Sequence, residues 1–151
     1  MRNKPCLTAS DAQTIITACK NAAVQKNWNV SIAIVDDGGY LVHVESLDGA
    51  VLPSPEVAIL KARTAALSRC PTKSLEEIVK ERPATATFPG RLPVQGGLPI
   101  IYQGESIGGI GVSGAKSHED EYVATAGLAA LESTILSFDP PPKLVGASHK
   151  P

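Results

Sequence analysis

The sequence has few aromatic residues, almost no net charge and no long apolar run. Phe, Trp and Tyr make up only 4% of the chain, so it lacks the stacking platforms that hold single-stranded nucleic acids. A formal charge of -1 supplies no basic surface for nucleic acid or for an anionic membrane. No stretch approaches the ~18 apolar residues of a membrane-spanning helix. We therefore expect a small-molecule ligand, no nucleic-acid partner and no membrane partner.

Cysteine is also sparse. Cys6, Cys19 and Cys70 form no CxxC or CxxxC pair, which argues against a zinc or iron–sulfur site, and we predict no metal ligands. The absence of a CxxCH sequence argues against covalent haem attachment. Residues 1–11 lack the apolar core of a secretory signal. We expect reduced thiols and a cytoplasmic protein.

The first third of the sequence predicts a helix and a β-hairpin. Thr8, with Asp11 three residues later, resembles a helix-capping pair. The apolar residues that follow recur at helical spacing and predict a helix that ends near Gln25. Two runs rich in β-branched residues, 30–36 and 40–46, flank an Asp-Gly turn, which is typical of a hairpin.

The rest of the sequence predicts three helices and a second hairpin. Ser54 and Pro55 predict the start of a helix, with serine as its cap and proline at its first position, and this helix is expected to run from Glu56 to about Arg69. A shorter helix should begin after Ser74, where Glu77 completes a capping box. The remaining patterns predict a hairpin over 100–112 and a last helix over 117–136.

This order of elements predicts an α/β domain of the α+β type over residues 1–139. Hairpins join antiparallel strands, so we expect one antiparallel sheet flanked by helices rather than a doubly wound parallel sheet. The length of 151 residues fits a single domain. The proline-rich residues 140–151 are predicted to form an extended tail.

The sequence from Gly109 to Gly114 matches the GxGxxG pattern of dinucleotide-binding proteins. That pattern binds a pyrophosphate only within a βαβ unit, which the predicted order of elements does not provide. The acidic residues 119–121 would also repel a phosphate. We interpret the glycines as positions where the strand packs closely against other backbone.

Three titratable side chains are candidates for acid/base catalysis: His43, His118 and Glu121. His43 shares a strand face with Glu45, which could orient the imidazole ring. His118 and Glu121 lie three residues apart and share a helix face. The alternative is structural, with His43 half-buried in the sheet and the acidic residues complementing the helix dipole.

The Gly- and Pro-rich stretch 85–99 predicts a binding loop. Arg91 could clamp a propionate or a small organic acid through two N–H donors, and a solvated surface charge is the alternative. The two ends of an antiparallel hairpin lie together. We therefore expect a single ligand site at the first turn of the last helix, formed by Arg91, Gly96, Gly97, Ser113 and Gly114.

Several fragments occur in a specific order over residues 8–136. They are AIVDDGG at 33–39, DGA at 48–50, KARTA at 61–65, GGLPI at 96–100 and IGGIGVSG at 107–114, continued by residues 120–121 and 126–127. Together they resemble the GlcG/HbpS family, also described as the haem-degrading or DUF336 domain. The resemblance implies a profilin-like fold, a homo-oligomer that is often an octamer, and haem as the cofactor of some members.

Three functions follow from these observations. The first is a cytoplasmic, homo-oligomeric protein that binds haem or a related tetrapyrrole, with haem degradation as an extension of that role. The second is a catabolic enzyme that acts on an organic acid as an isomerase, hydratase or hydrolase, with His43, His118 and Glu121 as its acid/base groups. The third is a structural or regulatory partner without chemistry of its own.

Overall fold

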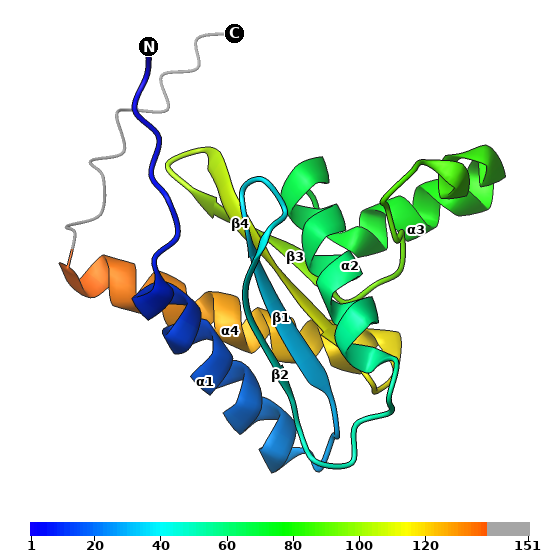
Figure 1. Cartoon of the computed structure of the whole chain (residues 1–151), viewed down its shortest axis with the longest axis horizontal. Coiled ribbons are helices and arrows are strands. Elements are labelled where there is room, and N and C mark those ends of the chain that lie inside the picture. The colour runs from blue at the N-terminus through cyan, green and yellow to red at the C-terminus, as the bar shows by residue number, and fades with distance from the viewer. Residues whose placement is uncertain (139–151) are drawn as a thin grey trace, which may run out of the picture.

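Helix α1 (Ala9–Gln25) begins at the predicted cap, in a computed structural model that describes residues 1–138 (Figure 1). The Thr8 hydroxyl accepts a hydrogen bond from the Asp11 N–H at 3.1 Å, and the Asp11 carboxylate accepts one from the Thr8 N–H at 2.9 Å. This reciprocal capping box satisfies two of the N–H groups that the first turn leaves unpaired. The predicted first helix is confirmed, and it buries Ile15, Ile16 and Cys19 against the sheet and α4.

The sheet is antiparallel throughout, as predicted. Its strands are β1 (Ser31–Asp36), β2 (Leu41–Ser46), β3 (Gly97–Tyr102) and β4 (Glu105–Ser113), in the spatial order β2-β1-β4-β3. The prediction that 85–99 is irregular is wrong at its end, because Gly97 already pairs with Gly111. Pro99 is tolerated there because β3 is an edge strand.

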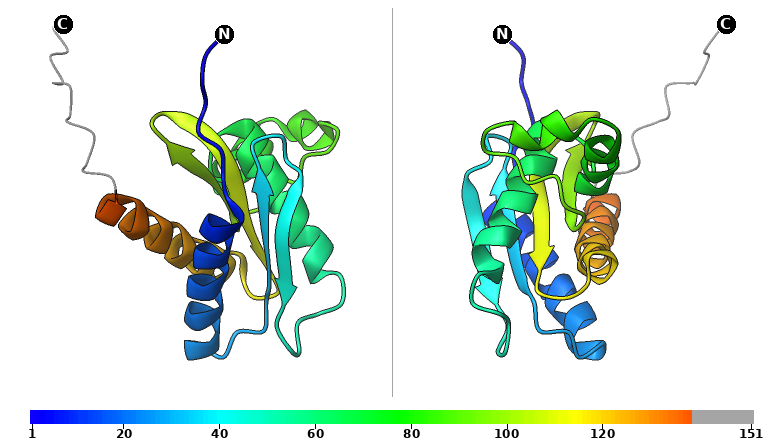
Figure 2. Two further views of the ribbon diagram at one scale, coloured as in Figure 1. Left: turned by 60° about the vertical axis from the view of Figure 1, so that its left-hand side comes forward. Right: turned by 90° about the vertical axis from the view of Figure 1, so that its right-hand side faces the viewer.

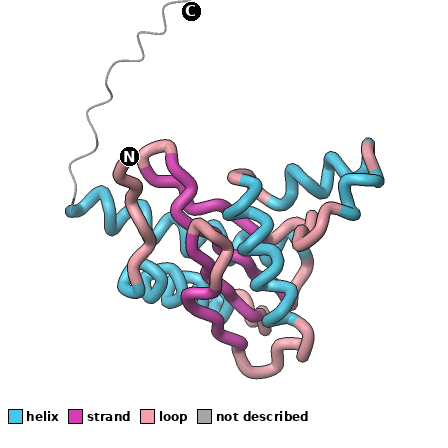
Figure 3. Tube along the Cα trace, turned by 45° about the horizontal axis from the view of Figure 1, so that its top comes forward, coloured by secondary structure: helices cyan, strands magenta, loops and turns pink. Residues whose placement is uncertain are grey.

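The helices cover both faces of the sheet (Figures 1 and 2). Helices α1 and α4 (Ser117–Phe138) lie on one face, and α2 (Ser54–Ser68) lies on the other. Helix α3 (Thr72–Glu81) and the short 3-10 helix η1 (Pro83–Thr87) project beyond the sheet beside the end of α2 (Figure 3). The chain is therefore an α+β protein, as predicted.

Two helices begin at residues other than the predicted ones, because their first side chains bind distant parts of the chain. Ser54 does not cap α2. Its buried hydroxyl lies 2.7 Å from the Ser31 hydroxyl and 2.6 Å from the Val51 carbonyl oxygen. Helix α3 begins at Thr72 rather than at Ser74, and the Thr72 hydroxyl accepts a hydrogen bond from the Gly97 N–H at 2.8 Å.

The glycines of β4 lie directly under α2. A β-carbon on Gly109 would collide with the Ala62 carbonyl oxygen, and one on Gly111 would collide with the Ala58 carbonyl oxygen. The GxGxxG pattern therefore permits a close approach between helix and strand backbones, as the structural interpretation predicts. No βαβ unit surrounds it among the described residues.

No helix among residues 1–138 combines the length and apolar character needed to cross a lipid bilayer. The predicted tail over 140–151, with its boundary at 139, lies outside the described residues.

Candidate functional site

The two ends of the second hairpin meet, as predicted, but buried groups of the protein occupy the meeting point. The Val112 N–H donates a hydrogen bond to the Gly96 carbonyl oxygen at 3.0 Å. A β-carbon on Gly96 would lie 2.8 Å from the Lys61 Nζ. The Gly97 N–H already donates to Thr72. Both glycines are buried, and the Gly97 N–H is already used within the fold, so the predicted role of that amide as a ligand donor does not fit these contacts.

A buried ion pair fills this position. The Lys61 Nζ lies 3.0 Å from the Asp120 Oδ2 and 3.0 Å from the Val112 carbonyl oxygen. The Asp120 Oδ1 accepts a hydrogen bond from the Ala115 N–H at 3.0 Å. Burial raises the pKa of the Asp120 carboxyl, while Lys61 and the Ala115 N–H act in the opposite direction. The pair ties α2 to the start of α4, and sequence reasoning missed it because its members are 59 residues apart.

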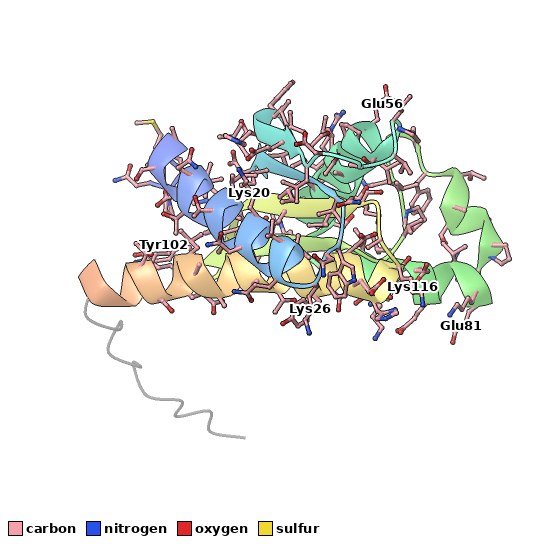
Figure 4. All side chains as sticks on the ribbon, turned by 90° about the horizontal axis from the view of Figure 1, so that it is seen from below. Lys20, Lys26, Glu56, Glu81, Tyr102 and Lys116 are labelled. Atoms are coloured by element: carbon pink, nitrogen blue, oxygen red, sulfur yellow. The ribbon has the colours of Figure 1, made fainter. Side chains whose placement is uncertain are left out.

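Gly114 lines a separate, polar cavity at the end of the sheet. This sheet-end cavity holds about 420 Å³ and is lined by residues 27–29, 49, 51, 114–116 and 119. Lys116, the residue before α4, lies on the same side of the molecule as Lys26 (Figure 4). Ser113 is half-buried and pairs with Ser31 in the sheet.

The three candidate acid/base residues do not converge in the cavities described here. His43 is half-buried on β2, and its neighbour Glu45 pairs with Lys20 of α1 at 2.8 Å. His118 is exposed at the start of α4. Glu121 is half-buried, and its Oε2 atom is buried without a hydrogen-bond partner among the described residues. No three His, Cys, Asp or Glu side chains within residues 1–138 come together as metal ligands would.

Arg91 lines a different cavity, which we call the α3 cavity. It holds about 350 Å³, and within the described residues its walls come from α2, α3, η1 and the following loop. They are Ser68, Leu75, Ile78, Val79, Arg82, Thr85, Phe88, Arg91 and Pro93. The prediction that Arg91 joins the first turn of the last helix is therefore not met, because α4 contributes no residue to this cavity.

Helix α3 explains how Arg82 reaches the same cavity. Leu75, Ile78, Val79 and Arg82 follow the i, i+3, i+4, i+7 spacing of one helix face. The Arg82 N–H, at the C-cap, donates to the Ile78 carbonyl oxygen at 2.8 Å. The chain then turns through η1 and the following loop, which places Arg91 at the same cavity. Sequence reasoning missed Arg82, although its spacing from the apolar face of α3 was a usable signal.

The cavity therefore combines an apolar wall with two cations. Leu75, Ile78, Val79, Phe88 and Pro93 provide the apolar surface. Two guanidinium groups can each present a pair of N–H donors to a carboxylate. This combination suits an amphipathic ligand that carries two carboxylates on an apolar body.

Comparisons with known proteins show that the chain is similar to one group of proteins both in sequence and in fold. A family model described as "Haem degrading protein HbpS-like" matches residues 7–129. Protein GlcG of Escherichia coli K12 is 40% identical over 114 residues, which are 75% of this chain and 85% of GlcG. A double mutant of Streptomyces reticuli HbpS superposes with a TM-score of 0.82 at 35% identity, covering 87% of this chain and 90% of that one. A PduOC:heme complex superposes with a TM-score of 0.78 at 27% identity, covering 83% and 95%.

Proposed function

The chain belongs to the HbpS-like family of haem degrading proteins, and from this membership we propose that it binds haem or a related tetrapyrrole in the α3 cavity. The observation that carries the proposal is the pair of arginines, Arg82 and Arg91, at one largely apolar cavity. The relative PduOC, solved as a heme complex, supports the choice of ligand class.

The cavity fits the periphery of a tetrapyrrole. Haem has a flat apolar ring and two propionates on one edge, and the α3 cavity offers apolar side chains beside two guanidinium groups. Its volume of about 350 Å³ lies at the lower end of the roughly 300–1,000 Å³ range of ligand sites. We therefore expect it to hold the propionate edge of the ring and to leave the remainder at the surface.

The lining does not offer a ligand to the iron. Among the described residues, the α3 cavity contains no His, Cys, Met or Tyr side chain. Bound haem would supply redox chemistry at its iron, whereas the residues of this chain hold the ring and its carboxylates. Binding is therefore expected to depend on the propionates more than on the metal.

The experiment is a visible-absorbance titration with haemin, iron-free protoporphyrin IX and protoporphyrin IX dimethyl ester. Haemin and iron-free protoporphyrin should bind with similar affinity. The dimethyl ester should bind at least about tenfold more weakly, because each charge-assisted hydrogen bond contributes about 1.5–3 kcal/mol. Arg91→Ala and Arg82→Ala should each weaken haemin binding by a similar factor, and Arg91→Lys should also weaken it.

Lys80→Ala is the matched control. Lys80 is exposed on α3 and does not line the cavity, so its loss removes one positive charge nearby without removing a proposed contact. This variant should bind haemin like the wild type. Unchanged affinity in both arginine-to-alanine variants would exclude the α3 cavity, and no binding of any porphyrin to the wild type would refute the function itself.

Glu121 favours acid/base catalysis on an organic acid as a second candidate function. Its Oε2 atom is buried and unpartnered among the described residues, which suits a group that exchanges a proton with a substrate. Deuterium incorporation into small 2-hydroxy and 2-keto acids, followed by NMR, tests this candidate. Incorporation that disappears in Glu121→Gln would favour it, and no incorporation by the wild type would count against it.

A further inference from the structure

The sheet-end cavity takes no part in either candidate function, and a second cavity adjoins it. The second cavity holds about 290 Å³ and shares residues 27–29 with the first. Val24, Leu47 and Asp48 complete its walls. We call the two cavities together the Trp28 groove. Its walls come mainly from three connections at one end of the molecule, α1–β1, β2–α2 and β4–α4 (Figure 1).

The end of α1 holds Trp28 in a defined position. Asn27 takes the left-handed conformation, with a φ of 56°, which asparagine adopts more readily than most residues. The Trp28 N–H then donates to the Ala23 carbonyl oxygen at 2.9 Å, in the pattern of a Schellman motif. The indole packs on the large core and meets the Tyr122 ring edge to face, with ring centroids 5.7 Å apart. The groove is therefore built around an aromatic side chain that the fold already orients.

The other two connections pack closely on Asn29. A β-carbon on Gly49 would lie 2.9 Å from the Asn29 Nδ2, and one on Gly114 would lie 2.7 Å from the Asn29 carbonyl oxygen. The Leu47 N–H donates to the Val30 carbonyl oxygen at 2.9 Å, which ties the end of β2 to the start of β1. These contacts give the groove its walls before any ligand binds.

The polar side chains of the groove have unused hydrogen-bonding capacity. Among the described residues, no hydrogen bond uses the side chain of Asn27, Asn29 or Asp48. The indole N–H of Trp28 has no hydrogen-bond partner there either. Each amide offers two donors and an acceptor, and the carboxylate offers acceptors alone. The groove therefore presents both donors and acceptors beside an aromatic ring.

The charges of the groove favour a neutral ligand. At the start of α4, the Lys116 N–H already donates to the Glu119 Oε1 at 3.1 Å, so this amide is not free to hold a phosphate. The carboxylates of Glu119 and Asp48 would repel an anion, and the Lys116 ammonium would repel a cation.

We propose that the Trp28 groove binds a neutral saccharide of one or two pyranose rings. A pyranose presents C–H groups on its faces, which pack on an aromatic ring, and hydroxyl groups around its edge, each of which donates and accepts. An amide or a carboxylate bonds two neighbouring hydroxyl groups at once. The cavity volumes of about 420 and 290 Å³ lie near the lower end of the roughly 300–1,000 Å³ range of ligand sites.

Trp28 is the only tryptophan of the chain, so its fluorescence reports directly on the groove. The full chain is titrated with glucose, galactose, mannose, xylose, N-acetylglucosamine, maltose and cellobiose. Acetate, free glycine and glycerol are titrated in parallel. At least one saccharide should change the tryptophan emission saturably, with a dissociation constant of about 1 mM or below. Saturation-transfer NMR should give the same constant, and the three small molecules should give no saturable change.

Two variants test the hydrogen bonds. Asp48→Ala should raise the dissociation constant for that saccharide at least about tenfold, and Asn29→Ala at least about threefold, because a charged acceptor contributes more than a neutral amide. Both residues are exposed, so both variants should fold, which circular dichroism checks. Asn21→Ala is the matched control, because it removes an amide from an exposed position of α1 outside the groove. It should bind the saccharide like the wild type.

The α3 cavity and the Trp28 groove share no residue, so this test is independent of haem binding. No saturable response to any of the saccharides, or an equal response to acetate, free glycine or glycerol, would overturn the proposal. Unchanged affinity in the folded Asp48→Ala and Asn29→Ala variants would also overturn it, as would a loss in Asn21→Ala equal to that in Asn29→Ala.

Discussion

The two faces of the sheet are stabilised by different means. The face under α1 and α4 buries large side chains, among them Ile32, Ile34, Ile110 and Val112. The face under α2 buries a small cluster, whose members are Ala33, Val35, Ala58, Ala62 and Ala66. The first face gains stability from the apolar area that it removes from water. The second buries little area and depends on the close approach of two backbones.

The two faces therefore differ in what they contribute. The large apolar side chains on the face under α1 and α4 stabilise the fold. The second face holds α2 in one position through glycine and alanine, and it leaves the flanks of that helix available. The α3 cavity lies near one end of α2. The proposed haem site is therefore on the side of the molecule with the smaller core.

The largest loss of stability is expected when a side chain is placed between α2 and the sheet. Gly111→Val would put a β-branched side chain against the Ala58 carbonyl oxygen and the Ala62 nitrogen. The atoms in the way belong to the helix backbone, which cannot shift without disrupting α2. We therefore expect a loss of more than about 4 kcal/mol of unfolding free energy, or no folded protein. Urea denaturation measures the effect.

Gly104→Ala serves as the comparison, because no atom lies within 4 Å of its added β-carbon. Its cost should be about 1 kcal/mol, from the positive φ of 77° alone. A Gly111→Val protein as stable as Gly104→Ala would show that close backbone packing does not hold α2 in place.

The second-largest loss of stability is expected from breaking the buried ion pair between Lys61 and Asp120, which joins the two faces. Lys61→Met leaves the Asp120 carboxylate buried without its cation, and losing one member of such a pair costs about 3–5 kcal/mol. The double variant Lys61→Met with Asp120→Leu should lose less than the single variant, because no unpaired charge remains. A double variant less stable than Lys61→Met would contradict this account.

The same pair predicts a pH dependence. Burial raises the pKa of the Asp120 carboxyl in the folded protein, so the folded state holds this proton to a higher pH than the unfolded state does. The contribution of this group to stability is then greatest below its unfolded pKa and falls as the pH rises through its folded pKa. Asp120→Asn should remove that component from the urea midpoints measured between pH 4 and pH 7.

The face under α1 and α4 is tested by removing apolar volume. Ile110→Ala should cost about 2–5 kcal/mol, because the residue is fully buried in the large core. Ile101→Ala, at an exposed position on the neighbouring strand, should cost less than about 1 kcal/mol. Equal losses in the two variants would show that area burial is not what stabilises this face.

Local patterns predicted most of the fold. The capping box at Thr8 and the Asp-Gly turn after β1 are made by residues close in sequence, so they could be recognised without the structure. The starts of α2 and α3 could not, because Ser54 binds Ser31 and Thr72 binds Gly97. Bonds across the fold replaced the caps that local spacing predicted.

The candidate site was harder to predict for the same reason. Arg91 was identified from its loop, but its neighbour in the cavity, Arg82, comes from a different element. Gly96 and Gly97 were recognised as unusual, but the reason lies in distant residues: Gly96 packs against the Lys61–Asp120 pair, whose members are 59 residues apart, and Gly97 packs against the Lys61 backbone and Thr72. Residue type indicated that these positions matter, and only the tertiary contacts separate a packing role from a binding role.

The last prediction compares the two faces without any substitution, through the rates at which the thiols react. Cys19 of α1 is fully buried, and burial raises its pKa to about 12. It should react with a thiol reagent at pH 8 only when the large core opens. Cys70 follows α2 and is half-buried, with a pKa that burial also raises, so it needs only a local opening beside α3. Cys6 is exposed and should react first.

Mass spectrometry of the modified peptides over time should give the order Cys6, Cys70, Cys19, with Cys19 modified only as fast as the whole protein unfolds. Modification of Cys19 as fast as that of Cys70 would mean that the face with the larger core opens as easily as the face with the smaller one.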